Sequence, residues 1–172
     1  MSDFDQLIDR RHSHSTKWEK YAGQDILPFW VADMDFAAPD FIRNALCERL
    51  EHPIIGYTRP PTSLTEAFQG WLNHHYGWSI PAEWVVWLPG VVPGMNMAAR
   101  CLSAKQRLMI PTPVYYPFLD IADNAQRQDV RVPLILDRGV WRMDLEHMQS
   151  QIGGVKMVMI ANPQNPTGRA YT

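Results

Sequence analysis

Between residues 84 and 161 the chain alternates short apolar runs with segments of helical periodicity. The apolar runs predict strands near residues 84–88, 107–110, 130–135 and 155–161, and the segments between them predict helices near 93–103, 115–125 and 144–151. Neighbouring parallel strands need a long crossover, which is usually a helix. The alternation therefore predicts an α/β fold with a mostly parallel sheet flanked by helices.

The part of the chain before this alternation has a different pattern. The first thirty residues are polar and irregular, which predicts an arm rather than a packed element. Apolar residues at helical spacing then predict one helix over about 39–51 and another over about 63–76. In the second helix, Ser63 and Glu66 match a capping box and Gly77 is a natural left-handed stop.

The composition is that of a soluble globular domain, with 172 residues of which 46% are hydrophobic and 20% charged. A formal net charge of -2 leaves no basic field for a polyanion, so a nucleic-acid partner is not expected. The apolar runs are too short to cross a bilayer, which favours a cytoplasmic protein over a membrane protein. Cys47 and Cys101 lie in apolar helical patterns, where we expect small buried thiols rather than a disulfide.

Residues 89–95 form a turn between a predicted strand and a predicted helix. Its glycines permit close approach of the backbone, and free N–H groups at the start of a helix would face an anion such as a phosphate. The groups expected to be free are those of Val91, Val92, Gly94 and Met95. The same glycines and prolines also suit the geometry of an ordinary turn, so the residues alone leave both interpretations open. Neither a dinucleotide nor an NTP fingerprint is present.

Two further loops follow predicted strands. Tyr115 lies where α/β sheets bind ligands, and its ring would either stack on a planar heterocycle or pack in the core. Residues 162–169 contain two Asn-Pro steps and a glycine, which is turn chemistry. An asparagine carboxamide held by proline would also be able to donate a hydrogen bond to a phenolate or carbonyl oxygen of a ligand.

These loops resemble those of a known enzyme family. Residues 162–169, Asn-Pro-Gln-Asn-Pro-Thr-Gly-Arg, resemble the N-P-x-N-P-[TV]-G-R signature of fold-type I pyridoxal-phosphate enzymes. Within the class I/II aminotransferase superfamily, the chain is similar to the N-terminal part of the MalY/PatB-type cystathionine β-lyases, also called C-S lyases. The segments that carry this second resemblance are residues 30–36, 56–57, 89–93 and 112–118.

The resemblance implies contacts to pyridoxal 5'-phosphate and to an amino-acid substrate. The backbone amides of Gly90, Val91 and Val92 would hold the cofactor phosphate, and Tyr115 would stack on the pyridine ring. Asn165 would donate a hydrogen bond to the cofactor O3', and Tyr57 would reach the phosphate of the neighbouring subunit in a homodimer. The residues expected to line the substrate pocket are Trp30, Ala32, Asp33 and Tyr116.

The resemblance also implies a domain layout and an activity. Residues 1–52 would form the N-terminal arm and a small-domain segment, and residues 53–172 would form the N-terminal part of the large cofactor-binding domain. The expected reaction is α,β-elimination from cystathionine or cysteine, which gives a thiol, pyruvate and ammonia. An aminotransferase on the same scaffold is the alternative, because both activities use the same cofactor contacts.

The catalytic residues of this family are expected beyond Thr172. They are the lysine that forms the Schiff base, the aspartate that pairs with the pyridine nitrogen and the arginine that binds the substrate carboxylate. The chain's own lysines offer no replacement, so we expect the chain to be inactive alone. A large domain truncated at this point is also expected to expose apolar faces. A non-catalytic binding module, or a truncation product without function, is the hypothesis of a different class.

Two other chemistries are disfavoured. The pairs His12 with His14 and His74 with His75 lack further ligands at metal-binding spacing, so no metal site is predicted. No G-x-S-x-G nucleophile elbow occurs, which disfavours a hydrolase.

Overall fold

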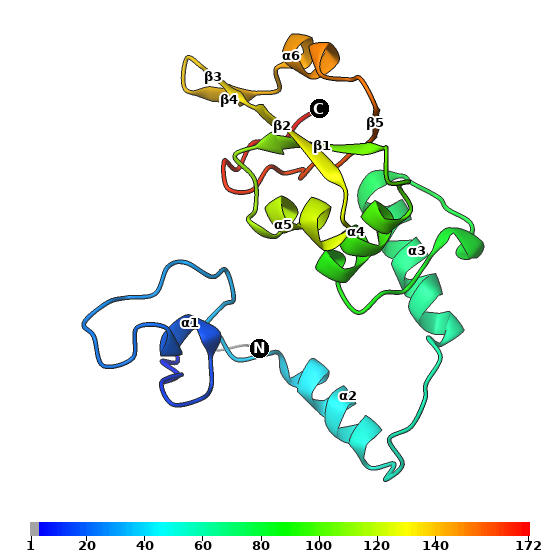
Figure 1. Cartoon of the computed structure of the whole chain (residues 1–172). Helices are drawn as coiled ribbons and strands as arrows, with labels where there is room; N and C mark the ends of the chain where they lie inside the picture. The colour runs from blue at the N-terminus through cyan, green and yellow to red at the C-terminus, as the bar shows by residue number, and fades with distance from the viewer. Residues whose placement is uncertain (1–3) are drawn as a thin grey trace. The chain divides into compact units, whose positions relative to one another are not determined.

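The computed structural model describes residues 4–172 and divides the chain into two compact units (Figure 1). Unit 1 extends to Arg59, and unit 2 runs from Pro60 to Thr172. The sequence placed a domain boundary between residues 52 and 53, within the last part of unit 1. The assignment of these units to a small and a large domain stays a prediction.

Within residues 4–59, unit 1 contains two helices in an otherwise irregular chain. They are α1 (Thr16–Glu19) and α2 (Asp40–Leu50). The helix predicted over 39–51 is confirmed as α2, with Pro39 as its N-cap residue. No residue of α2 is buried, and its apolar side chains Phe41 and Leu46 are mostly exposed. This helix therefore exposes apolar side chains.

Unit 2 contains most of the regular structure. Its elements in chain order are α3 (Thr62–Tyr76), η1 (Ala82–Trp84), α4 (Val91–Arg100), β1 (Arg107–Thr112), α5 (Pro117–Asn124), β2 (Gln128–Pro133), β3 (Ile135–Asp137), β4 (Val140–Arg142), α6 (Leu145–Ser150) and β5 (Val155–Val158). Strands β2, β1 and β5 form a parallel sheet in that order, and β3 pairs with β4 as an antiparallel hairpin. The predicted α/β fold with a mostly parallel sheet is confirmed.

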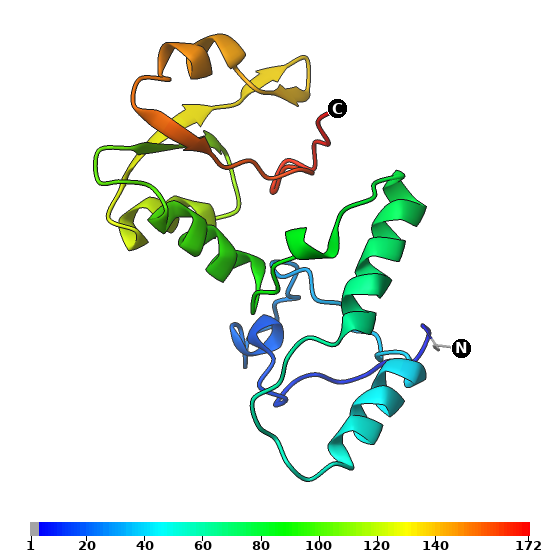
Figure 2. The same ribbon diagram turned by 90° about the vertical axis from the view of Figure 1, so that its right-hand side faces the viewer.

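Strand β1 lies in the centre of the sheet and separates two apolar cores. Leu108 and Ile110 face one side, where they pack with residues of α4 and α5. Met109 faces the other side, where it packs with Val130 of β2 and Met148 of α6. Figures 1 and 2 accordingly show α4 and α5 on one face of the sheet and α6 on the opposite face. Because both faces of β1 are covered, the strand is a continuous apolar run rather than an alternating one.

The strand predicted near 84–88 is wrong. Residues 82–84 form the short helix η1, and the chain from Val85 to Gly90 is irregular. A strand requires a neighbour to accept its backbone hydrogen bonds. No strand of the described residues 4–172 pairs with this apolar run, and Val86 remains 75% exposed.

The predictions for helix α3 are right about its bounds, to within one residue, and wrong about its N-terminal cap. Gly77 has a φ of 62°, and its N–H donates to the carbonyl of Asn73, as expected for a left-handed stop. The capping box is wrong, because Pro61 is the N-cap residue and no side chain caps the helix. Ser63 is already inside the first turn, so its hydroxyl is not at the capping position.

Both cysteines are free and exposed, so the prediction of buried thiols is wrong. Cys47 lies on α2, where no residue is buried, and Cys101 follows the last residue of α4. Within residues 4–172, no helix combines the length and the apolar character needed to cross a membrane. The same residues contain no group of three or more His, Cys, Asp or Glu side chains that would hold a metal ion.

Candidate functional site

The candidate ligand-binding loops of unit 2 leave the parallel sheet at its carboxyl edge. From β1 the chain crosses through α5 to β2, and it then returns through α6 to β5 on the other side of β1. The two crossover helices lie on opposite faces of the sheet (Figure 2). This reversal makes the space outside the carboxyl ends of β1 and β5 a topological switch point, where open α/β sheets bind ligands.

The start of α4 presents free backbone donors. Gly90 precedes the helix with a φ of 149°, and Val91 and Val92 occupy the first turn, where N–H groups have no acceptor within the helix. The expectation for Gly94 and Met95 is wrong, because the helix begins at Val91 and not near residue 93. The N–H of Gly94 donates to the carbonyl of Gly90, and Met95 lies in the second turn.

An open apolar depression of about 870 Å³ lies beside the start of α4. Gly90 and Val91 line it together with Phe118 of α5 and with residues 158–161, which include the end of β5. Of the predicted cofactor residues in unit 2, Val92, Tyr115 and Asn165 do not line this depression. The depression therefore extends from the α4 turn to Phe118, which follows the Tyr115 loop, and to residues 158–161, which precede the Asn165 loop.

Tyr115 and Tyr116 lie in the loop between β1 and α5. Their ring centroids are 5.0 Å apart at an interplanar angle of 61°, which is an edge-to-face contact. The side chains remain 37% and 64% exposed. Their carbonyls accept the N–H groups of Phe118 and Leu119, which fixes the backbone at the start of α5. Both rings are thus held at the carboxyl edge with accessible surface.

The loop after β5 is closed by its own hydrogen bonds. The N–H of Gln164 donates to the carbonyl of Arg169, and the N–H of Gly168 donates to the carbonyl of Gln164, both at 2.7 Å. Asn162 exchanges two hydrogen bonds with the backbone of Tyr171, at 3.0 and 3.1 Å. Asn165 lies at the tip, is exposed, and makes no side-chain hydrogen bond within residues 4–172. Its carboxamide is therefore available to a ligand.

Gln164 is a residue of this edge that the sequence reasoning missed. Its side chain is 1% exposed, and its Nε2 donates to the carbonyl of Pro113 at 2.7 Å. The carbonyl oxygen Oε1 of the same side chain is buried without a partner. The only signal in the sequence was a neutral hydrogen-bonding residue between two Asn-Pro steps, and such residues are usually exposed.

The remaining predicted residues belong to unit 1. Tyr57 is fully exposed. Trp30 is 42% exposed, and the Nζ of Lys20 lies 4.1 Å from its ring centroid, as in a cation–π contact. Ala32 and Asp33 line a second depression of about 570 Å³.

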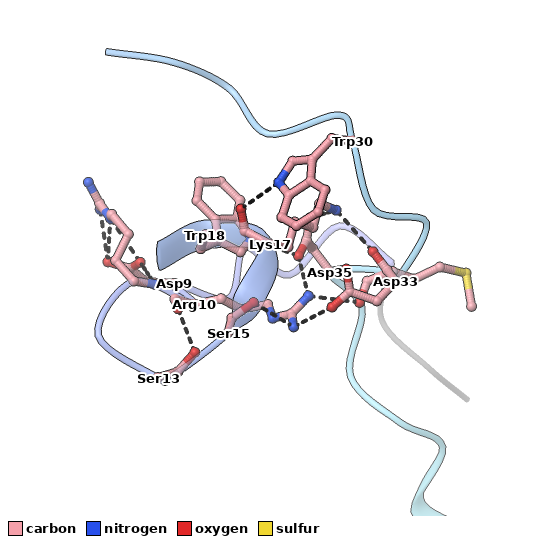
Figure 3. A network of polar contacts seen from close by, with 11 residues as sticks. Asp9, Arg10, Ser13, Ser15, Lys17, Trp18, Trp30, Asp33 and Asp35 are labelled. Carbon is pink, nitrogen blue, oxygen red and sulfur yellow. Dashed lines mark hydrogen bonds and ion pairs between the residues drawn. The ribbon is translucent and has the colours of Figure 1, made fainter. Parts of the chain in front are cut away.

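Asp33 belongs to an ion-pair network that the sequence reasoning missed (Figure 3). Arg10 bridges the carboxylates of Asp33 and Asp35, with nitrogen–oxygen distances of 2.6 Å to each. Lys17 donates to the Asp35 carboxylate at 2.7 Å, and the indole N–H of Trp18 donates to it at 2.9 Å. The network ties the arm to the segment that carries Trp30, Ala32 and Asp33.

These contacts alter the ionisation of two groups. The hydrogen bond from Lys17, followed by those from Trp18 and Arg10, holds the pKa of Asp35 well below its usual value. The carboxylates of Asp33 and Asp35 in turn raise the pKa of Arg10. These contacts therefore stabilise the charged forms of Asp35 and Arg10.

The fold and these loops define unit 2 as a doubly wound α/β domain whose candidate ligand-binding edge lies at the carboxyl ends of β1 and β5. Residues 25–172 match the family described as Aminotransferase class I and II. The chain belongs to this family.

Individual relatives agree with the family match. The chain is 34% identical to cystathionine beta-lyase PatB of Bacillus subtilis over 99% of its length and 46% of PatB. A PLP-bound putative aminotransferase from Clostridium difficile 630 superimposes with a TM-score of 0.90 and 38% identity, over 100% of this chain and 46% of that protein. The PLP-bound C-S lyase from Staphylococcus hominis superimposes with a TM-score of 0.90 and 34% identity, over 99% and 45%. The chain thus spans less than half the length of these proteins.

Proposed function

We propose that unit 2 forms part of a binding site for pyridoxal 5'-phosphate. The observation that carries the proposal is that β1 and β5 are adjacent and parallel, so the loops with Tyr115 and Asn165 leave the sheet at one edge. The PLP-bound C-S lyase and PLP-bound putative aminotransferase that share this fold support the choice of ligand.

The residue types at this edge fit the parts of the cofactor. The N–H groups of Val91 and Val92 suit a phosphate, because the start of a helix carries a partial positive charge. The exposed ring of Tyr115 suits the pyridine ring, and the carboxamide of Asn165 suits the phenolic oxygen O3'. Pyridoxal 5'-phosphate supplies, when bound, a ring that withdraws electrons from the substrate Cα.

For the whole protein we propose C-S β-lyase activity on a sulfur-containing amino acid such as cystathionine. Its similarity to PatB and to the Staphylococcus hominis C-S lyase supports this activity. An aminotransferase is the second candidate, and the 38% identity to the putative aminotransferase from Clostridium difficile favours it. Pyruvate release from cystathionine, measured against amino-group transfer to a keto acid, would distinguish the two.

We further propose that Trp30, Ala32, Asp33 and Tyr116 each take part in substrate binding in the whole protein. Tyr57 would contact the cofactor phosphate of the neighbouring subunit in a cytoplasmic homodimer. The family resemblance of residues 30–36, 56–57 and 112–118 supports these roles. In this proposal Arg10 acts indirectly, because it neutralises Asp33 and fixes the direction of its carboxylate.

The chain alone is proposed to be inactive. Lys105 precedes β1, and Lys156 lies at the start of β5, so both are at the amino end of the sheet. Lys17 is paired with Asp35, and Lys20 lies over the Trp30 ring. An elimination assay with cystathionine and added pyridoxal 5'-phosphate should detect no pyruvate, and measurable turnover would contradict this proposal.

Cofactor binding is tested with pyridoxamine 5'-phosphate, which has an amine in place of the aldehyde and does not react with lysines. Asn165→Ala removes a donor to a charged oxygen and should weaken binding roughly tenfold or more. Asn124→Ala, at the end of α5, is the matched control and should leave the affinity unchanged. Equal affinities for Asn165→Ala and the unmodified chain would contradict the assigned site.

A further inference from the structure

Gln164 occupies the one position where the loops after β1 and β5 are joined. The backbone pairing of the two strands ends with the bond from the N–H of Met159 to the carbonyl of Met109. Beyond it, the side-chain bond from Gln164 to Pro113 is the only hydrogen bond between residues 110–118 and 160–172, all of which the structure describes. The two residues are 51 positions apart in the chain.

The bond lies close to both proposed cofactor contacts. Pro113 directly follows β1 and precedes Tyr115 by two residues, and Gln164 directly precedes Asn165. Each end of the bond is thus at most two residues from a proposed cofactor contact. A shift of Gln164 relative to Pro113 would therefore change the distance between the Tyr115 ring and the Asn165 carboxamide.

The chemistry of the position requires a neutral donor. The carbonyl of Pro113 accepts, so the group that faces it must carry a hydrogen, which fixes the amide orientation of Gln164. A carboxylate of the same shape would bring an oxygen against that carbonyl in a buried place. The buried Oε1 of Gln164 has no partner, which is unfavourable. An apolar side chain would avoid this cost, so packing alone does not explain a glutamine at this position.

We propose that Gln164 is a positioning residue that holds the Tyr115 loop and the Asn165 loop in register, so that both meet the same ligand. This role rests on the proposed function of the edge as a pyridoxal-phosphate site. The coupling of the two loops is a property of the chain itself and exists without ligand.

The proposal is tested by hydrogen exchange of the free chain, with two substitutions of similar size. Gln164→Met removes the donor and should raise amide exchange roughly two- to tenfold in residues 114–118 and 160–169 together. Gln164→Glu should behave like Gln164→Met while ionised and should return toward the unmodified chain once protonated, because a carboxylic acid donates. Burial raises the pKa of this new carboxyl, so the recovery should have its midpoint above about 4.3.

Gln69→Met is the matched control. The Nε2 of Gln69 also donates to a backbone carbonyl at 2.7 Å, that of Ile80, but the bond joins α3 to the segment after it. Its loss should leave exchange in both loops unchanged. Two results would overturn the proposal. One is that Gln164→Met raises exchange only in residues 160–169. The other is that exchange in the Gln164→Glu chain, relative to the unmodified chain at the same pH, does not change with pH.

A second measurement separates this proposal from the proposed function and covers a variant that does not fold. In the unmodified chain the side-chain amide of Gln164 should exchange as slowly as the backbone N–H of Met159, and fast exchange would contradict the bond. Pyridoxamine 5'-phosphate should bind the Gln164→Met chain roughly two- to tenfold more weakly than the unmodified chain. If the unmodified chain does not bind it at all, the site assignment fails, whereas the exchange results still decide the coupling.

Discussion

Gly90→Ala should destabilise unit 2 because of the backbone conformation at this position. Gly90 has a φ of 149° and a ψ of 165°, a region that is essentially restricted to glycine. An added Cβ would lie 3.5 Å from the Cδ of Pro93, which is an ordinary contact, so no steric clash contributes. Holding alanine in this conformation costs about 1–3 kcal/mol. The chain must either lose that stability or shift the turn that presents the N–H groups of Val91 and Val92.

Gly70→Ala provides a control of opposite sign in the same unit. Gly70 lies inside α3, and no atom lies within 4 Å of an added Cβ, so alanine should stabilise the helix by about 0.5–1 kcal/mol. Urea unfolding monitored by tryptophan fluorescence measures both changes, and a titration with pyridoxamine 5'-phosphate measures binding. If Gly90→Ala unfolds and binds like the unmodified chain, both the strain and the phosphate role assigned to Gly90 are refuted.

Three further predictions concern stability. Asp144→Ala removes the carboxylate that accepts the N–H of His147 and should cost about 0.5–2 kcal/mol in urea unfolding, whereas Ser63→Ala removes no cap and should stay within about 0.5 kcal/mol. An ammonium, an indole N–H and a guanidinium lower the pKa of Asp35 in the folded chain. The contribution of Asp35 to the free energy of unfolding is therefore complete above the ordinary pKa of 3.8 and is lost as the pH falls through the folded pKa. The Asp35→Asn chain should not show this loss of stability in an acid titration. Ile110→Ala should cost about 2–5 kcal/mol and Ile110→Val about 0.5–1.5 kcal/mol in urea unfolding, because this side chain is fully buried against α4 and α5, and similar small effects of both changes would contradict the packing.

The elements that the sequence predicted well are those whose neighbours are also encoded nearby. Strand β1 is an apolar run because α5 and α6, both within the next 40 residues, cover its two faces. The run at 84–88 is also apolar but has no strand beside it within residues 4–172. Apolar character alone therefore predicts neither a strand nor burial, because both depend on a partner that the local sequence does not specify.

The sequence predicted the loops of the candidate site but not the hydrogen bonds and ion pairs that join residues far apart in the chain. Tyr115 and Asn165 follow from turn chemistry at the ends of apolar strands, because such loops leave a parallel sheet at one edge, and Val91 follows from the glycine turn that opens a helix. The bonds from Gln164 to Pro113 and from Arg10 to Asp33 join residues that are 51 and 23 positions apart. No periodicity links such pairs, so only the folded chain identifies them.

The most direct test of the site is the response of individual backbone amides to pyridoxamine 5'-phosphate in an isotope-labelled chain. Saturable shifts should concentrate on Val91, Val92, Tyr115 and Asn165, and a phosphate ion alone should reproduce only those at Val91 and Val92. Shifts that leave the Tyr115 and Asn165 loops unaffected at saturation would contradict the account.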